Sequence, residues 1–211
     1  MPVKTWKVDD PSGDVQFLIS KQDFPGVEVA AGKRVHSGGL SEGVTSVEIN
    51  NGKLTLVVLP TRGMGIQRVV PSGDSELKTI GWQSPVRGPV HPAFVDLGEP
   101  SGLGWLDGFD EFFVRCGLES NGAPDFDPKT GRLLYPLHGR IANRPAHDVE
   151  LTVDSDKQEI SLRGVVEETR FHFLKLRNGV PESFKGDGAT AAEFPQQPPA
   201  KTGFILHRSC P

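Results

Sequence analysis

Alternating apolar and polar residues are clearest between residues 44 and 59. Val44–Asn50 (VTSVEIN) and Lys53–Leu59 (KLTLVVL) flank the dipeptide Asn51-Gly52. Asn-Gly accepts the positive φ angles of a two-residue type I′ turn, so this segment predicts a β-hairpin. Shorter apolar runs predict two further strands, at residues 15–20 before the hairpin and at residues 67–70 after it.

A second stretch with strand periodicity runs from residue 147 to residue 177. Glu159-Ile160-Ser161-Leu162 and Arg170-Phe171-His172-Phe173 both alternate with a period of two. This period is expected for strands that bury one face. A polar turn at residues 154–157 separates two of the runs, so the stretch predicts an antiparallel meander.

The strand pattern stops after Arg177. Residues 178–211 are rich in Gly, Pro, Ala, Gln and Thr and show no strand or helix periodicity, which predicts an irregular or disordered tail. We therefore expect one domain over residues 1–177, followed by this tail. A meander that ends in such a tail leaves an open sheet edge, so we expect the domain to be incomplete. A frameshifted reading, a mispredicted gene end and a genuine truncation each explain the tail.

The composition agrees with a fold of short strands. The chain of 211 residues contains 25 glycines and 18 prolines, which interrupt long helices. A short helix is expected at residues 106–114, although Gly108 weakens it. Together with the alternation, these features predict an all-β fold, an antiparallel β-sandwich.

Charge and cysteine content exclude several classes of protein. The net charge of −4 gives no basic surface for nucleic acid. The two cysteines are too few for a disulfide framework and form no CxxC pair, which fits a reducing compartment. No apolar run approaches the roughly 18–20 residues of a membrane helix, and the N-terminus lacks the apolar core of a signal peptide. We expect a cytoplasmic protein without a nucleic-acid or membrane partner.

Three segments carry a family resemblance. They are Leu59–Ile66 (LPTRGMGI), Gly104–Glu111 (GWLDGFDE) and Leu137–Arg144 (LHGRIANR). In this order and spacing they resemble an aldose 1-epimerase-like group of unknown function within the galactose mutarotase-like superfamily. The resemblance covers roughly residues 15–177 and leaves the tail unmatched. It implies a supersandwich, of which this chain carries the N-terminal portion.

The resemblance also implies an activity. Proteins of this type interconvert sugar anomers or epimers by acid/base catalysis without a redox cofactor, so a small-molecule sugar or sugar derivative is the expected partner. They also have a second half with the remaining sandwich strands, a second histidine and a glutamate that serves as the base, and these segments are not recognisable here. A non-catalytic carbohydrate-binding module and an inactive truncated product therefore stay open as alternatives. The oligomeric state is open as well.

His138 is the candidate catalytic residue. The resemblance implies that it lies on an inner strand and binds and orients the sugar, and Gly139 allows a ligand to approach closely. Histidine suits proton transfer because its unperturbed pKa is near neutrality. Arg140 would share the face of His138 on a strand, and Arg144 follows on the same segment; both are candidate sugar ligands. The alternatives are a structural histidine and surface or salt-bridged arginines.

Three further residues are candidate sugar ligands. Arg62 stands on a glycine-flanked turn directly after an apolar strand, and Trp105 and Glu111 belong to an acidic and aromatic segment. Aromatic faces stack on sugar C–H groups, and carboxylates accept hydrogen bonds from hydroxyls. The alternatives are a turn arginine paired with an acid, a core tryptophan and a solvated acidic face. No metal site is expected, because the acidic segment 125–131 lacks the spacing and final glutamate of an EF-hand.

Overall fold

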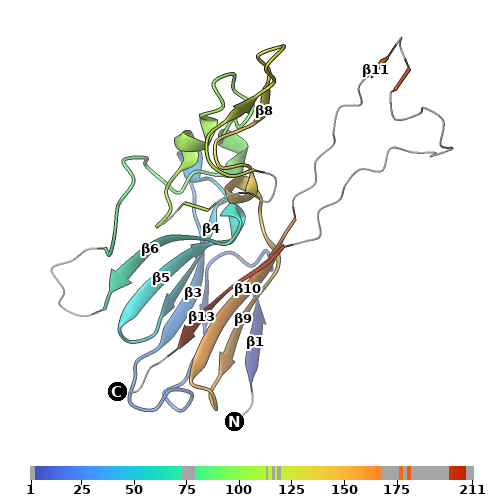
Figure 1. Cartoon of the computed structure of the whole chain (residues 1–211). Helices are drawn as coiled ribbons and strands as arrows, with labels where there is room; N and C mark the ends of the chain where they lie inside the picture. Colours follow the sequence, from blue (N-terminus) through green and yellow to red (C-terminus); the bar gives the residue numbers. More distant parts are fainter. Residues whose placement is uncertain are drawn as a thin grey trace.

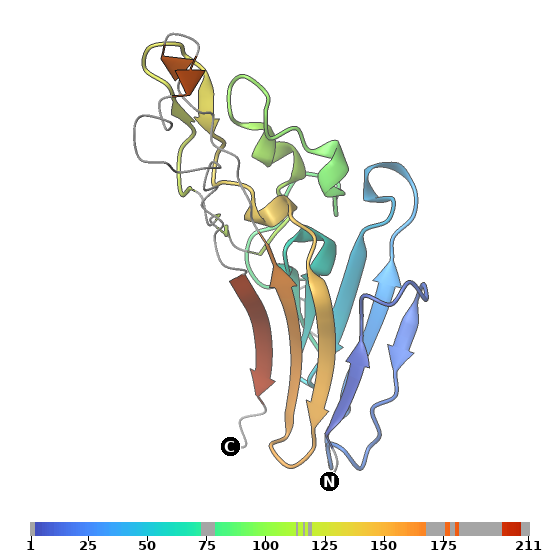
Figure 2. The ribbon, with the colours of Figure 1, turned by 90° about the vertical axis from the view of Figure 1, so that its right-hand side faces the viewer.

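The structure is a computed structural model that describes residues 3–72, 79–112, 114–115, 117, 120–167, 176–177, 180–181 and 200–207. Two antiparallel sheets pack face to face, and the loops of residues 81–146 lie above them (Figure 1). We call these loops the crown. Figure 2, turned by 90°, shows the strands of both sheets running roughly parallel to the long axis of the molecule below the crown.

The first sheet has five strands in the order β2-β3-β4-β5-β6. The strands are β2 (Val15–Phe17), β3 (Ala30–Val35), β4 (Thr45–Asn50), β5 (Leu54–Leu59) and β6 (Gly65–Pro71). The turn between β4 and β5 contains Asn51-Gly52, and Gly52 has a φ of 88°. The predicted hairpin is therefore confirmed, in a register that pairs Ile49 with Leu56. The predicted type I′ turn is wrong, because Gly52 has a positive φ but Asn51 does not.

The second sheet has four strands in the order β1-β9-β10-β13. The strands are β1 (Lys4–Lys7), β9 (His147–Asp154), β10 (Glu159–Val166) and β13 (Ala200–His207). Strands β9 and β10 form the predicted antiparallel pair, with Leu151 opposite Leu162. Two short pairs complete the described strands: β7 (Asp125–Phe126) with β8 (Leu133–Tyr135), and β11 (Leu176–Arg177) with β12 (Val180–Pro181).

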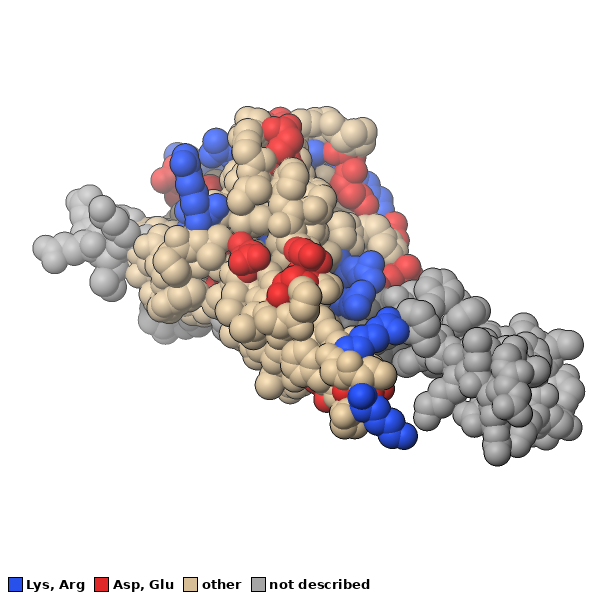
Figure 3. All heavy atoms as spheres, turned by 90° about the horizontal axis from the view of Figure 1, so that it is seen from above, with Lys and Arg blue, Asp and Glu red and all other residues tan. Residues whose placement is uncertain are grey.

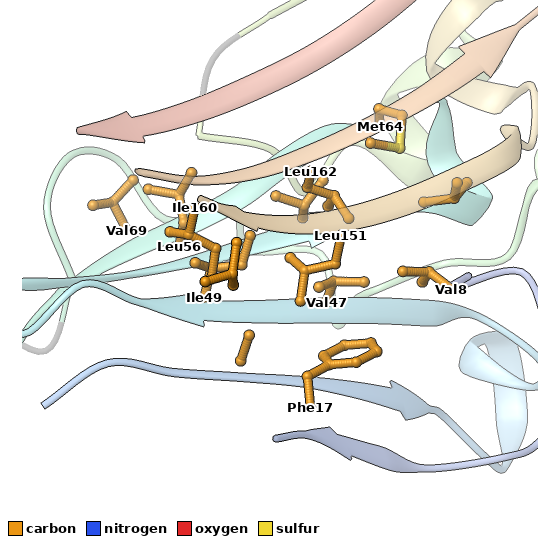
Figure 4. Close-up of a cluster of buried hydrophobic side chains, with 14 of the residues drawn as sticks. Val8, Phe17, Val47, Ile49, Leu56, Met64, Val69, Leu151, Ile160 and Leu162 are labelled. Carbon is orange, nitrogen blue, oxygen red and sulfur yellow. The ribbon is translucent and has the colours of Figure 1, made fainter. Parts of the chain in front are cut away.

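The core lies between the two sheets, where the inward faces of β4, β5, β9 and β10 meet (Figure 4). Val149, Leu151 and Val153 alternate with less buried neighbours along β9 and are at most 1% exposed. Ile160 and Leu162 of β10 face the same core. Burial of this many aliphatic side chains is the main stabilising contribution to such a fold, at roughly 25 cal/mol per Å² of apolar surface. The all-β antiparallel sandwich predicted from the sequence is confirmed.

The crown is built from loops and short 3-10 turns. The 3-10 turns are η1 (Gly39–Ser41), η2 (Pro60–Arg62), η3 (Pro92–Phe94), η4 (Gly104–Gly108) and η5 (Ile141–Asn143), of which η2 to η5 lie at or within the crown. No helix among the described residues combines the length and the apolar character that crossing a bilayer requires.

The structure differs from the sequence prediction in three places. The helix expected at residues 106–114 is instead the short turn η4, because Phe109 adopts extended backbone (ψ 107°). Strand β3 lies between residues 20 and 44, where the sequence predicts no strand. Strand β13 lies in the segment for which the sequence predicted irregular chain, and it pairs with β10. The alternating run at residues 168–175, which includes His172, lies outside the described residues.

Candidate functional site

The three segments that carry the family resemblance meet at the base of the crown. Gly63, after η2, packs so closely on η5 that a Cβ there would overlap the carbonyl oxygen of Ile141. The main-chain nitrogen of Ala146 donates to the carbonyl of Pro60 at 2.9 Å, which ties the same two segments together. A Cβ at Gly108 would lie 2.7 Å from Nη1 of Arg62, so η4 packs on the Arg62 side chain. Small residues therefore allow the three segments to converge.

Arg62 lies at the centre of this convergence and is fully buried. Its Nη1 donates to the carbonyl of Val90 at 2.9 Å, and its Nη2 lies 4.0 Å from Oε1 of Glu111. Glu111 is also buried and accepts from Nε of Arg115 at 2.9 Å and from Nη2 of Arg115 at 3.1 Å. Burial lowers the pKa of Arg62 although the charge of Glu111 raises it. This ion cluster links η2 to the loop after η4.

The ion cluster leaves part of the Arg62 side chain without partners. Nε and Nη2 of Arg62 have no hydrogen-bond partner in the part of the chain that the structure describes, and neither has Nε1 of Trp105. Nδ2 and Oδ1 of Asn143 on η5 are likewise buried without a hydrogen-bond partner among the described residues. Buried polar atoms are normally satisfied, so their concentration at the crown marks it as a place where a ligand, water or further protein would be accommodated.

A row of four aromatic rings crosses the crown. Trp82 stacks on Phe109 with ring centroids 5.3 Å apart, and Phe109 stacks on Trp105 at 4.4 Å. Trp105 in turn meets the ring of His138 edge-on at 4.8 Å. The row begins at the surface, where Trp82 is 55% exposed, and continues inward to Trp105, which is 2% exposed. The structure thus brings the predicted residues Trp105 and His138 into contact.

The His138 segment is a turn rather than the strand that the sequence predicted. His138 and Gly139 both have positive φ, at 55° and 72°, which a strand does not permit. His138 is held by its backbone, whose nitrogen donates to Gly122 at 2.9 Å and whose carbonyl accepts from Gly117 at 2.7 Å. Arg140, half-buried, follows at the N-terminal side of η5. The shared strand face expected for His138 and Arg140 is therefore wrong.

Arg144 lies at the other end of η5, where its main-chain nitrogen donates to the carbonyl of Ile141 at 3.2 Å. Its own carbonyl oxygen would lie 3.3 Å from a Cβ at Gly63. The backbone of Arg144 therefore belongs to the convergence of the three segments. A sugar contact by Arg140 or Arg144 stays a prediction.

A polar hollow of about 180 Å³ opens at the surface end of the ring row. Its lining combines the exposed indole of Trp82 with carboxylate, amide, hydroxyl and guanidinium groups, among them Gln67, Arg68, Ser84, Arg87 and Asp110. Seen from above, charged side chains stand out from a largely uncharged surface (Figure 3). Among the described residues, no three His, Cys, Asp or Glu side chains gather as a set of metal ligands.

Asp110 is the carboxylate of the hollow with a shifted pKa. Burial raises its pKa above the usual value of an aspartate, although the hydrogen bond from Gln67 and the charges of Arg62 and Arg68 lower it. Nε2 of Gln67 donates to Oδ2 of Asp110 at 2.6 Å. A carboxyl whose pKa is raised toward neutrality, and which lines a hollow, is suited to general acid or base chemistry.

Four of the six candidate residues from the sequence belong to two groups in the structure. Arg62 and Glu111 join the buried ion cluster, and Trp105 and His138 join the ring row. Sequence analysis missed Trp82 and Gln67, because both lie in segments without a motif. Their pairing with Phe109 and Asp110 spans 27 and 43 residues, which a local pattern cannot reveal.

The chain is similar to known proteins along most of its length. Residues 41–180 match a family described as a domain of unknown function (DUF4432). A solved structure from Klebsiella pneumoniae subsp. pneumoniae MGH 78578, described as a "putative aldose 1-epimerase", is similar with a TM-score of 0.66 and 36% identity. The match covers 82% of this chain and 45% of that one, so this chain spans less than half the length of that protein. No curated protein matches the chain.

Proposed function

The chain belongs to the DUF4432 family, and from this premise we propose that it is a carbohydrate-binding protein of the aldose 1-epimerase type. In this proposal it interconverts sugar anomers or epimers by acid/base catalysis. The similarity to the Klebsiella protein supports the class of activity. The observation that carries the proposal is that an exposed tryptophan, Trp82, and a half-buried carboxyl with a raised pKa, Asp110, line the same hollow.

The hollow offers the two kinds of contact that a sugar ring uses. The Trp82 indole, supported from beneath by Phe109, presents an aromatic face for sugar C–H groups. Gln67, Ser84 and Asp110 present hydrogen-bonding groups for hydroxyls. Its volume of about 180 Å³ is below the ~300 Å³ at which drug-sized sites begin, which suits one sugar ring better than an oligosaccharide.

The reaction moves two protons. A base removes the proton from the anomeric hydroxyl, and an acid protonates the ring oxygen as the bond between C1 and O5 breaks. Rotation about the C1–C2 bond and closure in the reverse sense give the other anomer, so no redox cofactor is used. We assign the proton exchange in the hollow to Asp110, because its raised pKa brings the acid and base forms closer together in energy.

His138 takes a different place in this proposal. It is half-buried and lies at the other end of the ring row, separated from Trp82 by the rings of Phe109 and Trp105. A sugar in the hollow therefore meets Asp110 first, and direct contact with His138 requires a second position for the sugar. The substitution His138→Ala distinguishes the two positions, since loss of sugar affinity in a folded variant places the sugar at His138.

A non-catalytic carbohydrate-binding module is the alternative. The reaction uses both an acid and a base, and the second carboxylate lining the hollow, Glu111, is held by Arg115 and Arg62. This engagement favours binding without turnover. Polarimetry of a freshly dissolved aldose separates the two functions, because an enzyme accelerates the approach to anomeric equilibrium and a binding module does not.

The experiment that tests sugar binding is a thermal melt with a panel of aldoses and sugar phosphates. A sugar at ten times its Kd stabilises the native state by about 1.4 kcal/mol, which raises the Tm of a domain of this size by roughly 3–5 °C. We expect this shift for wild type and for Phe94→Ala, but not for Trp82→Ala. Phe94 is a matched control because it is an exposed crown aromatic, 52% accessible against 55% for Trp82, and does not line the hollow. Equal shifts in all three proteins would contradict the proposed position.

A further inference from the structure

A second cavity, of about 320 Å³, is lined by residues of β3 and β4, whereas the polar hollow is lined by residues of β6, an edge strand of the first sheet. The two share no residue. The second cavity is bounded by the chain after β1, by β3 and the start of β4, by η2 and by the entry to β9. Its volume reaches the ~300 Å³ at which small-molecule pockets begin. Neither the family resemblance nor the proposed function assigns it a role.

A buried lysine lines this cavity. Lys33 of β3 is 3% exposed, and its Nζ donates to the main-chain carbonyl of Asp10 at 2.7 Å. No carboxylate of the described residues lies within 4.0 Å of Nζ. An ammonium group has three donor hydrogens, and buried ammonium groups are normally paired with an anion. The Lys33 ammonium therefore has two donors and one positive charge to offer to a ligand in the cavity.

Two threonines, Thr45 and Thr61, line the same cavity. Oγ1 of Thr61 accepts from the main-chain nitrogen of Thr45 at 2.9 Å, which leaves its hydroxyl hydrogen to donate elsewhere. The Thr45 hydroxyl adds another donor. These groups and the Lys33 ammonium form a set of donors suited to the oxygens of a carboxylate.

The remaining walls have a different character. Val8, Pro60 and Val149 contribute apolar surface, and Asp9 and Asp10 are exposed acidic side chains. The carboxylates of Asp9 and Asp10 accept main-chain hydrogen bonds from Val149 at 3.2 Å and Ser12 at 3.0 Å and keep further acceptor sites. Such acceptors favour hydroxyl donors on the outer part of a ligand and repel a second anionic group.

From this arrangement we infer that the cavity binds a small polyhydroxy carboxylate of the sugar-acid class. Its single carboxylate lies on Lys33 and the two threonines, its hydroxyls face Asp9 and Asp10, and its carbon chain lies on the valines and proline. A neutral polyol lacks the charge that matches Lys33, and a ligand with several anionic groups is repelled by the two aspartates. The site is separate from the polar hollow, so the inference does not depend on sugar binding there.

Calorimetric titration with gluconate and sorbitol tests the inference. Both are six-carbon acyclic polyols without an anomeric centre, and they differ at C1, where gluconate has a carboxylate and sorbitol a hydroxymethyl group. We expect gluconate to bind wild type and Lys129→Met equally and sorbitol to bind neither. Lys129→Met removes the same charge from an exposed position outside the cavity. Lys33→Met should weaken gluconate at least tenfold, whereas unchanged affinity or equal binding of sorbitol would overturn the inference.

The fold of the Lys33 variant is checked separately. Methionine has a similar length without the charge, and replacement of a poorly paired buried charge by an apolar group is often neutral or stabilising. We expect Lys33→Met to unfold in urea at the same or a higher midpoint than wild type. Should the variant fail to fold, Thr45→Val provides the second test, because it keeps the shape of the side chain and removes a hydroxyl donor. Gluconate affinity that does not change in folded Thr45→Val would also overturn the inference.

Discussion

Buried charged groups are treated differently at the two ends of this molecule. At the base of the sandwich, Asp23 accepts four hydrogen bonds: from Nζ of Lys4 at 2.6 Å, from the nitrogen and Oγ of Ser20 at 2.8 and 2.9 Å, and from Oγ of Ser155 at 3.0 Å. At the crown, Arg62 is more deeply buried, yet two of its nitrogens have no partner among the described residues. The buried charge of Asp23 at the base is fully hydrogen-bonded, whereas Arg62 at the crown keeps hydrogen-bond donors without a partner among the described residues.

The two ends also shift carboxyl pKa values in opposite directions. The hydrogen bond from Lys4 holds the pKa of Asp23 well below its usual range, whereas burial raises the pKa of Asp110. A lowered pKa means that the folded state favours the charged form and gains stability from it. A raised pKa means that ionisation is costly in the folded state, as is often found at functional sites. The two carboxyls therefore differ in what ionisation does to the folded state: ionisation of Asp23 stabilises it, and ionisation of Asp110 is costly to it.

The largest expected effect comes from the ion cluster under the crown. Glu111→Ala removes the carboxylate nearest to the fully buried Arg62 and should lower the free energy of unfolding by about 3–5 kcal/mol. Urea unfolding at pH 7 measures it, with Asp107→Ala as the control, because Asp107 is an exposed acid on η4. A loss below about 1 kcal/mol would show that the ion cluster contributes little to stability and that burial of Arg62 does not depend on Glu111.

Asp23→Ala should have the next largest effect. It removes four hydrogen bonds, of which the one from Lys4 joins the loop after β2 to β1 and the one from Ser155 joins it to the turn after β9, so we expect a loss of about 2–3 kcal/mol at pH 7. Because folding lowers the pKa of Asp23, its contribution is complete above the unfolded pKa of about 4 and is lost as the pH falls below it. The difference between wild type and variant should therefore shrink between pH 5 and pH 2. A difference that does not depend on pH would contradict the role of the charge.

Asp110→Asn should shift stability in the opposite direction. Because folding raises the pKa of Asp110, its stabilising contribution is present at low pH and is lost as the pH rises through the folded pKa. The variant should gain less than about 1 kcal/mol at pH 7, since the site is partly exposed, and should match wild type near pH 3. Any acceleration of anomer exchange should disappear. A variant that loses stability at pH 7 would show that the ionised Asp110 stabilises the folded state, as Asp23 does.

Trp82→Ala should have the smallest effect on stability. Its side chain is more than half exposed, so we expect the free energy of unfolding to change by no more than about 0.5 kcal/mol. Sugar-dependent changes should nevertheless be lost. A large loss of stability would show that the ring row, which Trp82 enters through Phe109, holds the crown together rather than presenting a binding face.

The sandwich could be predicted from the sequence because its signals are local. Val149, Leu151 and Val153 alternate with less buried residues, and Asn51-Gly52 marks its hairpin directly. Strand β3 was missed because Lys33, a residue type that usually marks an outward face, is buried at its centre. A buried lysine reverses the pattern on which the prediction depends.

The crown could be predicted only in part. The motif segments gave Arg62, Glu111, Trp105 and His138, which the structure joins as an ion pair and a ring contact. Which of these groups are buried depends on how three distant segments pack, and no local pattern carries that information. Trp82 comes from a segment without periodicity and reaches the ring row through tertiary contact alone.

Sugar binding at the crown is tested most directly by saturation-transfer-difference NMR on the chain mixed with the aldose panel. Irradiation of the aromatic protons of wild type should transfer magnetisation to the ring protons of at least one sugar, because the Trp82 indole faces the hollow. The transfer should persist in Phe94→Ala and fall to background in Trp82→Ala. No transfer to any sugar in wild type, or equal transfer in Trp82→Ala, would contradict the account.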